Sequence, residues 1–186
     1  MVVVAGAIAG RHTEELGKVK DFTSAELKEL YDTLGIGALK FFLLRVDPKK
    51  RMIFNPEESI DFHGFTGPFV QYTHARIKSI LRKEKAVDSQ QSTVDSTLLK
   101  MEKALIVKLE QYSTIVEQAA SEHNPSVLAI YAFELAKMFN AFYTEHSVMN
   151  AESDEKKQLR LKLSEMTANV IASAMGLLGI KVPERM

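Results

Sequence analysis

The hydrophobic and polar positions of this chain follow the helical period over most of its length. The clearest case is the segment from residue 68 to residue 85, where apolar side chains recur at roughly 100° per residue. The predicted buried stripe of this helix comprises Val70, Ile77, Ile80 and Leu81. Nearly opposite lie aromatic rings and cations, namely Phe69, Tyr72, Arg76 and Lys83. Thr66 or Gly67 can cap the helix, and Pro68 suits its first position.

The face with aromatic rings and cations has two interpretations. Rings interleaved with cations suit a surface on which nucleic-acid bases stack and phosphates are neutralised. Alternatively, Phe69 and Tyr72 pack against a second helix while the cations face water. Periodicity alone favours this packing interpretation.

Two apolar segments precede this helix. Thr23 or Ser24 can cap a helix that Gly35 is expected to end. Its apolar positions are Leu27, Leu30, Tyr31 and Leu34. The apolar run over 37–46 fits a buried helix or a buried strand, and its content of Ala, Leu and Lys favours the helix. A further helix starts at Asn55-Pro56, with Glu58 at the capping-box position.

The second half of the chain predicts more helices after a polar segment, 86–97, that reads as an exposed loop. Apolar positions from Leu98 to Ala119 support one interrupted helix or two successive helices, and Asn124-Pro125 forces a boundary. The next helix has a stripe of Leu128, Tyr131, Leu135, Met138, Phe139 and Phe142, with Tyr143 at its rim. The last helix starts at Ser153 and ends at Gly179, and its predicted stripe is Leu159, Leu163, Met166, Val170, Ala174 and Leu177. No segment alternates as a strand does, and residues 1–20 are weakly patterned, so the prediction is an all-α helical bundle.

Composition limits the possible classes of function. The 186 residues carry no net charge, which argues against a bulk polyanion binder and leaves only local basic patches such as the loop Pro48–Arg51. That loop is either a solvated turn or a phosphate contact. The chain has no cysteine, and no apolar run approaches the ~20 residues of a membrane span. We therefore expect a cytoplasmic protein without a membrane segment.

The chain carries no recognisable catalytic constellation. The histidines form no pair at metal-ligand spacing, so a zinc site is not expected, and His74 reads as a half-buried, hydrogen-bonded side chain beside the apolar stripe. Gly35-Ile36-Gly37 lacks the rest of either nucleotide-binding fingerprint. Without a nucleophile and its base, the chain is predicted to be a binding part and not an enzyme by itself.

Several ordered blocks resemble arginyl-tRNA synthetases. The run from Gly37 to Leu44 is similar to the signature of the DALR anticodon-binding domain, with Gly37 and Lys40 in place of its Asp and Arg. The resemblance continues through FNP at 54–56, TGPFVQYTHARIKSILRK at 66–83, LAIYAFELAKMFNAFYTEHSVM at 128–149 and RLKLSEMTANVIASAMGLLGIKVPERM at 160–186. It covers residues 35–186, and less securely 1–34, and includes the family's ending on Glu-Arg-Met.

The resemblance implies a carboxyl-terminal fragment. Both catalytic signatures of the class, of the His-Ile-Gly-His and Lys-Met-Ser-Lys-Ser types, are missing from the sequence. Residues 1–65 would be the end of the catalytic body with connecting helices, and residues 66–186 the helical DALR domain. ATP would be used in the absent catalytic region of the parent enzyme, so no cofactor is expected in this fragment.

The resemblance also implies a partner, the anticodon arm of arginine tRNA. By motif position it places Phe69 and Tyr72 against the anticodon loop, with Tyr143 as another wall and the terminal Met186 packed nearby. Phe69 stands where many relatives carry Tyr. Arg76 is a candidate phosphate or base contact because it shares a face with Tyr72, or it forms an ion pair with a neighbouring helix. We expect a monomer that works with the catalytic half of the same parent chain. The alternatives are the helical domain of another class I synthetase, such as the cysteinyl type, or a helical protein-interaction module.

Overall fold

The computed structural model describes residues 22–84 and 97–186, and all regular secondary structure in these ranges is α-helical. The prediction of an all-α bundle is confirmed, whereas the predictions for residues 1–20 and for most of the 86–97 loop lie outside the described residues. The helices are α2 (Ser24–Leu44), α3 (Pro56–Ser59), α4 (Gly67–Glu84), α5 (Lys100–Glu110), α6 (Tyr112–Ser121), α7 (Pro125–Glu145) and α8 (Asp154–Leu177).

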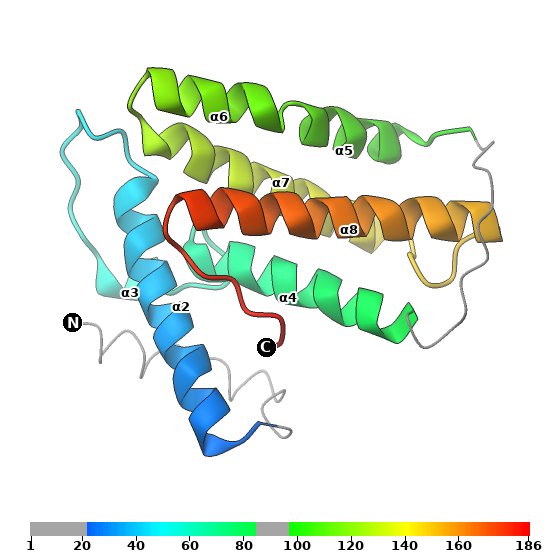
Figure 1. The fold of residues 1–186 in the computed structure, drawn as a ribbon, viewed down its shortest axis with the longest axis horizontal. Helices are drawn as coiled ribbons and strands as arrows, with labels where there is room; N and C mark the ends of the chain where they lie inside the picture. Colours follow the sequence, from blue (N-terminus) through cyan, green and yellow to red (C-terminus); the bar gives the residue numbers. More distant parts are fainter. Residues whose placement is uncertain (1–21, 85–96) are drawn as a thin grey trace.

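The helices form a bundle with one crossing helix at its end (Figure 1). α8 packs against both α4 and α7, and it runs in the opposite direction to α7. α5 and α6 follow one another along the outside of α7, so the prediction of two successive helices is correct. α2 crosses this bundle steeply, and the end of the chain passes close to α2 and α4. α4 thus contacts α2, α7 and α8, while α7 contacts α2, α4, α5, α6 and α8.

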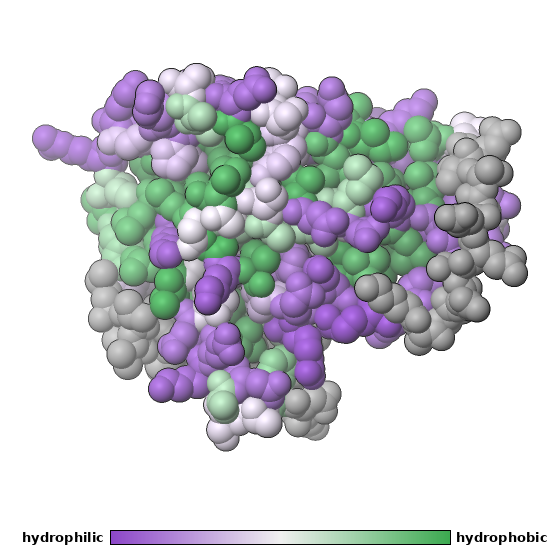
Figure 2. Space-filling model, in the orientation of Figure 1, coloured by the Kyte–Doolittle hydropathy of each residue, from purple (hydrophilic) through white to green (hydrophobic). Residues whose placement is uncertain are grey.

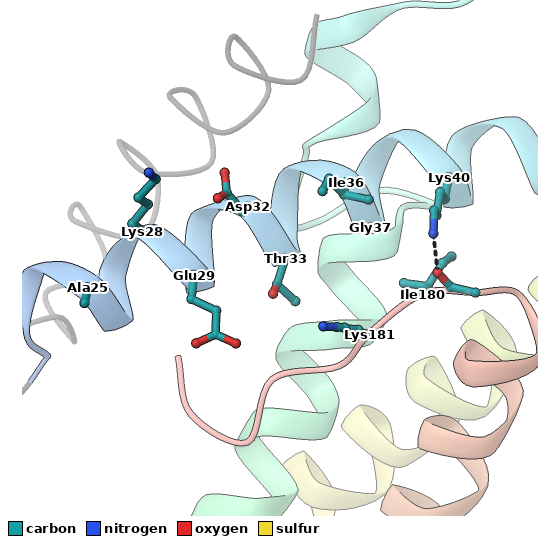
Figure 3. Close-up of a pocket in the computed structure, with 11 residues that line it drawn as sticks. Ala25, Lys28, Glu29, Asp32, Thr33, Ile36, Gly37, Lys40, Ile180 and Lys181 are labelled. Atoms are coloured by element: carbon teal, nitrogen blue, oxygen red, sulfur yellow. Dashed lines mark hydrogen bonds between the residues drawn. The ribbon is translucent and has the colours of Figure 1, made fainter.

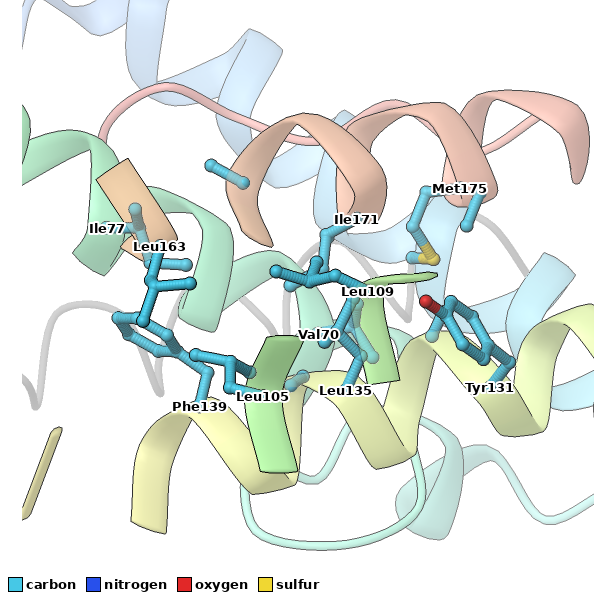
Figure 4. Close-up of a cluster of buried hydrophobic side chains, with 14 of the residues drawn as sticks. Val70, Ile77, Leu105, Leu109, Tyr131, Leu135, Phe139, Leu163, Ile171 and Met175 are labelled. Atoms are coloured by element: carbon cyan, nitrogen blue, oxygen red, sulfur yellow. The ribbon is translucent and has the colours of Figure 1, made fainter. Parts of the chain in front are cut away.

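The core lies where α4, α5, α7 and α8 meet (Figure 4). The predicted stripe of α7 is confirmed: five of its positions are fully buried and Met138 is partly buried. Val70, Ile77 and Ile80 of α4 are buried as predicted. Removing this apolar surface from water is the main driving force for assembling the bundle.

The prediction that Gly35 ends the first helix is wrong, because α2 continues through it to Leu44. Gly35 and Gly37 are buried inside the helix. A Cβ at Gly37 would lie 2.4 Å from Nε2 of Gln71 on α4, and one at Gly67 would lie 2.8 Å from the Gly37 carbonyl oxygen. Glycine therefore serves close approach of two helices here, a role that the linear sequence does not distinguish from a helix stop. The 37–46 run is helical up to Leu44, as favoured.

The predicted stripe of α8 is only partly correct. Leu163 and Ala174 are buried, but Met166 is 43% exposed and Leu177 is 61% exposed. Figure 2 shows apolar surface over this part of the bundle, between α5, α6 and α8. The buried face is rotated toward three polar residues, Arg160, Ser164 and Thr167.

These polar residues can be buried because each has partners. Arg160 is 1% exposed and pairs with Glu102 of α5 and with Glu152. The hydroxyls of Ser164 and Thr167 donate to backbone carbonyls one turn back in α8. A buried charge is tolerated when it is paired and hydrogen-bonded. Burial raises the pKa of Glu102, but hydrogen bonds from Lys156, the Leu99 amide and Arg160 lower it overall.

Several of the caps predicted from sequence are present in the described helices. Thr23 forms a capping box with Glu26, and Asn55 accepts hydrogen bonds from the first amides of α3. The capping box expected at Glu58 is not formed, because the Glu58 carboxylate accepts from Arg45 at 2.5 Å. α8 begins after Ser153 and ends at Leu177, two residues before Gly179, whose φ of 69° is the left-handed conformation that glycine favours. The basic residues Lys49, Lys50 and Arg51 are exposed in a turn.

Candidate nucleic-acid interface

An open groove lies between α4 and the carboxyl-terminal end of α7. Its volume is about 470 Å³. Its lining is Tyr72, Arg76, Ser79, Ile80 and Lys83 from α4, with Tyr143 and Thr144 from α7. Among these lining residues, all of them in the described part of the chain, two are cations and none is acidic. The groove is therefore suited to a ligand that combines flat rings with negative charge.

Arg76 lies at the centre of the groove. Its guanidinium carbon is 4.8 Å from the centroid of the Tyr72 ring and 5.8 Å from that of the Tyr143 ring. Nη1 donates to Oδ1 of Asn140 at 2.8 Å, and Nη2 donates to the Tyr72 hydroxyl at 3.3 Å. No ion pair of Arg76 is present within residues 22–84 and 97–186, so its charge is not neutralised by a carboxylate there. A guanidinium has five N–H donors, which leaves several for a ligand.

The two tyrosines are supported from behind. Tyr143 is 36% exposed, and its ring stacks on that of Phe139 with a centroid distance of 6.2 Å and an interplanar angle of 17°. Tyr72 is half-buried, and the edge-to-face contact with Phe62 has a centroid distance of 6.4 Å. The ring of Tyr143 thus has one side exposed and the other side fixed against Phe139. Such a ring can stack on a base with little further loss of side-chain freedom.

Asn140 is the residue of this site that the sequence did not reveal. Its Nδ2 donates to the Thr73 hydroxyl at 2.8 Å, and that hydroxyl donates to the Phe69 carbonyl at 2.9 Å. This chain of hydrogen bonds turns the amide oxygen of Asn140 toward Arg76. The only sequence signal is that Asn140 is the single side-chain amide among residues 125–145.

The structure brings Tyr72, Arg76 and Tyr143 together and separates Phe69 from them. The Phe69 ring packs against Phe133 of α7, with centroids 5.1 Å apart, and does not line the groove. This is the packing that periodicity alone favoured. A contact between Phe69 and RNA stays a prediction.

Met186 also lies outside the groove, but it is held in place. It packs with Phe22 and Phe62 against the buried Leu30 and Leu34 of α2. Phe62, which packs against the same two leucines, is the ring that contacts Tyr72. The terminus is ordered against α2.

His74 fits its predicted structural role and is even more buried. It is 1% exposed, and its Nδ1 lies 2.9 Å from the Pro183 carbonyl oxygen. Because a carbonyl can only accept, Nδ1 carries the hydrogen. Burial lowers the pKa of His74, against the opposing effects of this hydrogen bond and of Glu184. The neutral imidazole therefore predominates at neutral pH.

Neither a metal cluster nor a membrane span is found in the part of the chain that the structure describes. No group of three or more His, Asp or Glu side chains there could hold an ion. No helix in the same ranges is long and apolar enough to cross a bilayer.

The fold and the groove define an all-helical binding domain with an aromatic and cationic surface. Residues 70–186 match the family described as DALR anticodon binding domain. The chain belongs to this family.

Relatives with this fold carry names from one class of enzyme. The chain is 47% identical to the arginine–tRNA ligase of Flavobacterium psychrophilum over 178 residues, which are 96% of this chain and 29% of that protein. The structure is similar to that of the Thermus thermophilus arginyl-tRNA synthetase, with a TM-score of 0.90, 33% identity, and coverage of 100% of this chain and 31% of that one. The Plasmodium falciparum arginyl-tRNA synthetase shares the fold at a TM-score of 0.83, with 23% identity and coverage of 100% and 33%. The chain thus spans about 30% of the length of these relatives.

Proposed function

We propose that this chain is the anticodon-arm-binding part of an arginine–tRNA ligase and that it holds arginine tRNA for a catalytic region elsewhere in the parent protein. Membership of the anticodon-binding family and the names of the relatives support this proposal. The observation that carries it is Arg76 between Tyr72 and Tyr143 in a groove without a carboxylate lining it. ATP and arginine would bind to the catalytic region, so the chain itself would need no cofactor.

In this proposal, unstacked bases of the anticodon loop enter the groove. Single-stranded loops are what proteins read in RNA, because splayed bases can stack on aromatic rings and offer their edges. The exposed side of Tyr143 supplies a stacking surface, and the free N–H groups of Arg76 can donate to a base edge or a phosphate. Lys83 at the groove's edge would neutralise a neighbouring phosphate. Each stacked base is worth about 1–3 kcal/mol.

The proposal divides the chain as the sequence suggested. Residues 66–186 would form the DALR-type bundle, and residues 1–65 would be the end of the catalytic body with connecting helices. The family match over 70–186 supports the position of this boundary.

Binding of the purified chain to arginine tRNA tests the proposal. Fluorescence anisotropy would compare arginine tRNA, the same tRNA with a changed anticodon, and cysteine tRNA as a matched control. We expect the first to bind more tightly than the other two, with a steep fall in affinity as salt rises. Equal affinity for all three would refute anticodon recognition, and tighter binding of cysteine tRNA would assign the chain to the cysteinyl type.

The same preparation tests the division of labour between this chain and the rest of the parent. We expect no arginyl-tRNA to form from ATP, arginine and tRNA with this chain alone. Charging above a control without protein would contradict the proposal that catalysis resides elsewhere.

A further inference from the structure

The carboxyl-terminal segment, residues 179–186, is tied down by side chains that reach its backbone. Lys40 of α2 donates to the Gly179 carbonyl at 2.5 Å, the contact dashed in Figure 3. From α4, Gln71 donates to the Lys181 carbonyl at 2.8 Å, and His74 donates to the Pro183 carbonyl at 2.9 Å. Arg82 donates to the Glu184 carbonyl at 2.8 Å. Residues 179–186 are called the strap below.

The pattern of these contacts shows what is recognised. Four backbone carbonyls of the strap, those of residues 179, 181, 183 and 184, accept from these side chains. Gln71 and His74 lie three residues apart, so they project from one face of α4. The helices thus bind the strap by its carbonyls. Lys181 itself is exposed and contributes its carbonyl to the contact.

Two of these donors are costly to place. Gln71 is 0% exposed and His74 is 1% exposed, so the N–H groups of both need acceptors inside the protein. The Nε2 group of Gln71 has such acceptors, whereas its buried Oε1 has no hydrogen-bond partner among the described residues. Gln71 also donates to the Thr33 carbonyl of α2 at 3.2 Å. The absence of a side chain at Gly37 leaves the space for this amide. Gly37 of α2 and both Gln71 and His74 of α4 therefore accommodate the strap.

The strap ends on two leucines that also support one of the groove's rings. Its last residue, Met186, packs against the buried Leu30 and Leu34, and so does Phe62, which meets Tyr72 edge to face. Arg185 lies over the ring of Phe22 at 4.7 Å, within the same apolar cluster. Tyr72 thus contacts both Phe62 and Arg76.

We infer that Gln71 and His74 are positioning residues for the RNA-binding groove. By fixing the strap, they hold Met186 on the Leu30–Leu34 pair that also supports Phe62, and through Phe62 they set the orientation of the Tyr72 ring. Neither residue lines the groove. The inference rests on the proposed function for its RNA partner, while the coupling from strap to Tyr72 is a property of the protein alone.

The first experiment measures that coupling without RNA. His74→Leu removes the donor, and His74→Asn keeps an N–H donor near the position of Nδ1. Lys181→Ala is the matched control, because it changes the strap's side chain and keeps its carbonyl. With selectively labelled aromatic residues, we expect the Phe62–Tyr72 nuclear Overhauser effect to weaken and carboxypeptidase to release Met186 faster in His74→Leu only. A chain truncated after residue 182 serves if His74→Leu does not fold.

The second experiment measures arginine tRNA affinity in a cycle of His74→Leu and the truncation. We expect each change alone to weaken binding by about tenfold, within the range for loss of one stacked base. The double variant should be no weaker than the truncation, because His74 acts through the strap. This non-additivity distinguishes positioning from a general loss of stability.

The outcomes separate the two proposals. A freed strap with an unchanged Phe62–Tyr72 contact, or additive losses of affinity, overturns the positioning role. If the unaltered chain fails to bind arginine tRNA while the Phe62–Tyr72 contact still depends on His74, the proposed function fails and the positioning of Tyr72 by the strap stands.

Discussion

Replacing Tyr72 by Ala separates the contribution of this ring to RNA binding from its contribution to stability. Within the protein, the ring makes an edge-to-face contact with Phe62 and a cation–π contact with Arg76 at 4.8 Å. The first is worth about 0.5–1.5 kcal/mol and the second about 0.5–1 kcal/mol at an exposed site. The free energy of unfolding should therefore fall by about 1–2.5 kcal/mol, which a stable domain tolerates.

The loss in affinity should be of similar size but specific to this position. Losing one stacked base costs about 1–3 kcal/mol, which raises the dissociation constant for arginine tRNA about five- to 150-fold. Tyr72→Phe should keep most of the affinity, because it keeps the ring and loses the long hydrogen bond of 3.3 Å from Arg76. Anisotropy at fixed salt measures the affinity, and urea unfolding by circular dichroism measures the stability.

Tyr112→Ala is the matched control for this experiment. Tyr112 lies on α6, stacks on Tyr131 at 5.7 Å and donates to the Ser173 hydroxyl, so its loss should also destabilise the fold. It does not line the groove. We expect its affinity for arginine tRNA to stay within twofold of the unaltered chain. An unchanged affinity in Tyr72→Ala, or an equal loss in Tyr112→Ala, would refute the assignment of Tyr72 to the interface.

Three further predictions concern the supports of the groove and the core. Glu102→Ala should lower the free energy of unfolding in urea by about 3–5 kcal/mol, because the guanidinium of Arg160, 1% exposed, loses a buried partner; a loss below 1 kcal/mol would contradict this. Gly37→Ala should cost about 1–3 kcal/mol by the same measurement and release Met186 to carboxypeptidase, since the new Cβ would meet the side-chain amide of α4 at 2.4 Å. Burial lowers the pKa of His74, so the imidazole binds a proton more readily in the unfolded chain than in the folded one. The contribution of His74 to stability is therefore present above pH 6.5 and is lost as pH falls below that value. His74→Asn should remove this part of the pH dependence, and an identical slope in both proteins would contradict it.

The groove shows what the periodicity of a single helix can predict and what it cannot. The angles along α4 place Tyr72 and Arg76 on one face, and the structure keeps them there. Periodicity cannot say which neighbour covers that face. Phe69 lies on it too, but Phe133 of α7 covers the first turn, while the second and third turns stay open beside Tyr143. The resemblance to a family supplied the RNA partner, which no pattern of apolar positions contains.

The sequence by itself determined the all-α class, most of the helices and several of their caps. These depend on neighbours within about four residues, as in the capping box of Thr23 and the left-handed Gly179. Tertiary structure alone decided which polar groups are buried. Arg160 is buried in the core because Glu102, 58 residues away, accepts a hydrogen bond from it. Gln71 is buried because Gly37 leaves space for its amide and a carbonyl of the strap accepts from it. A polar side chain is buried or exposed according to partners that only the folded chain brings within hydrogen-bond distance.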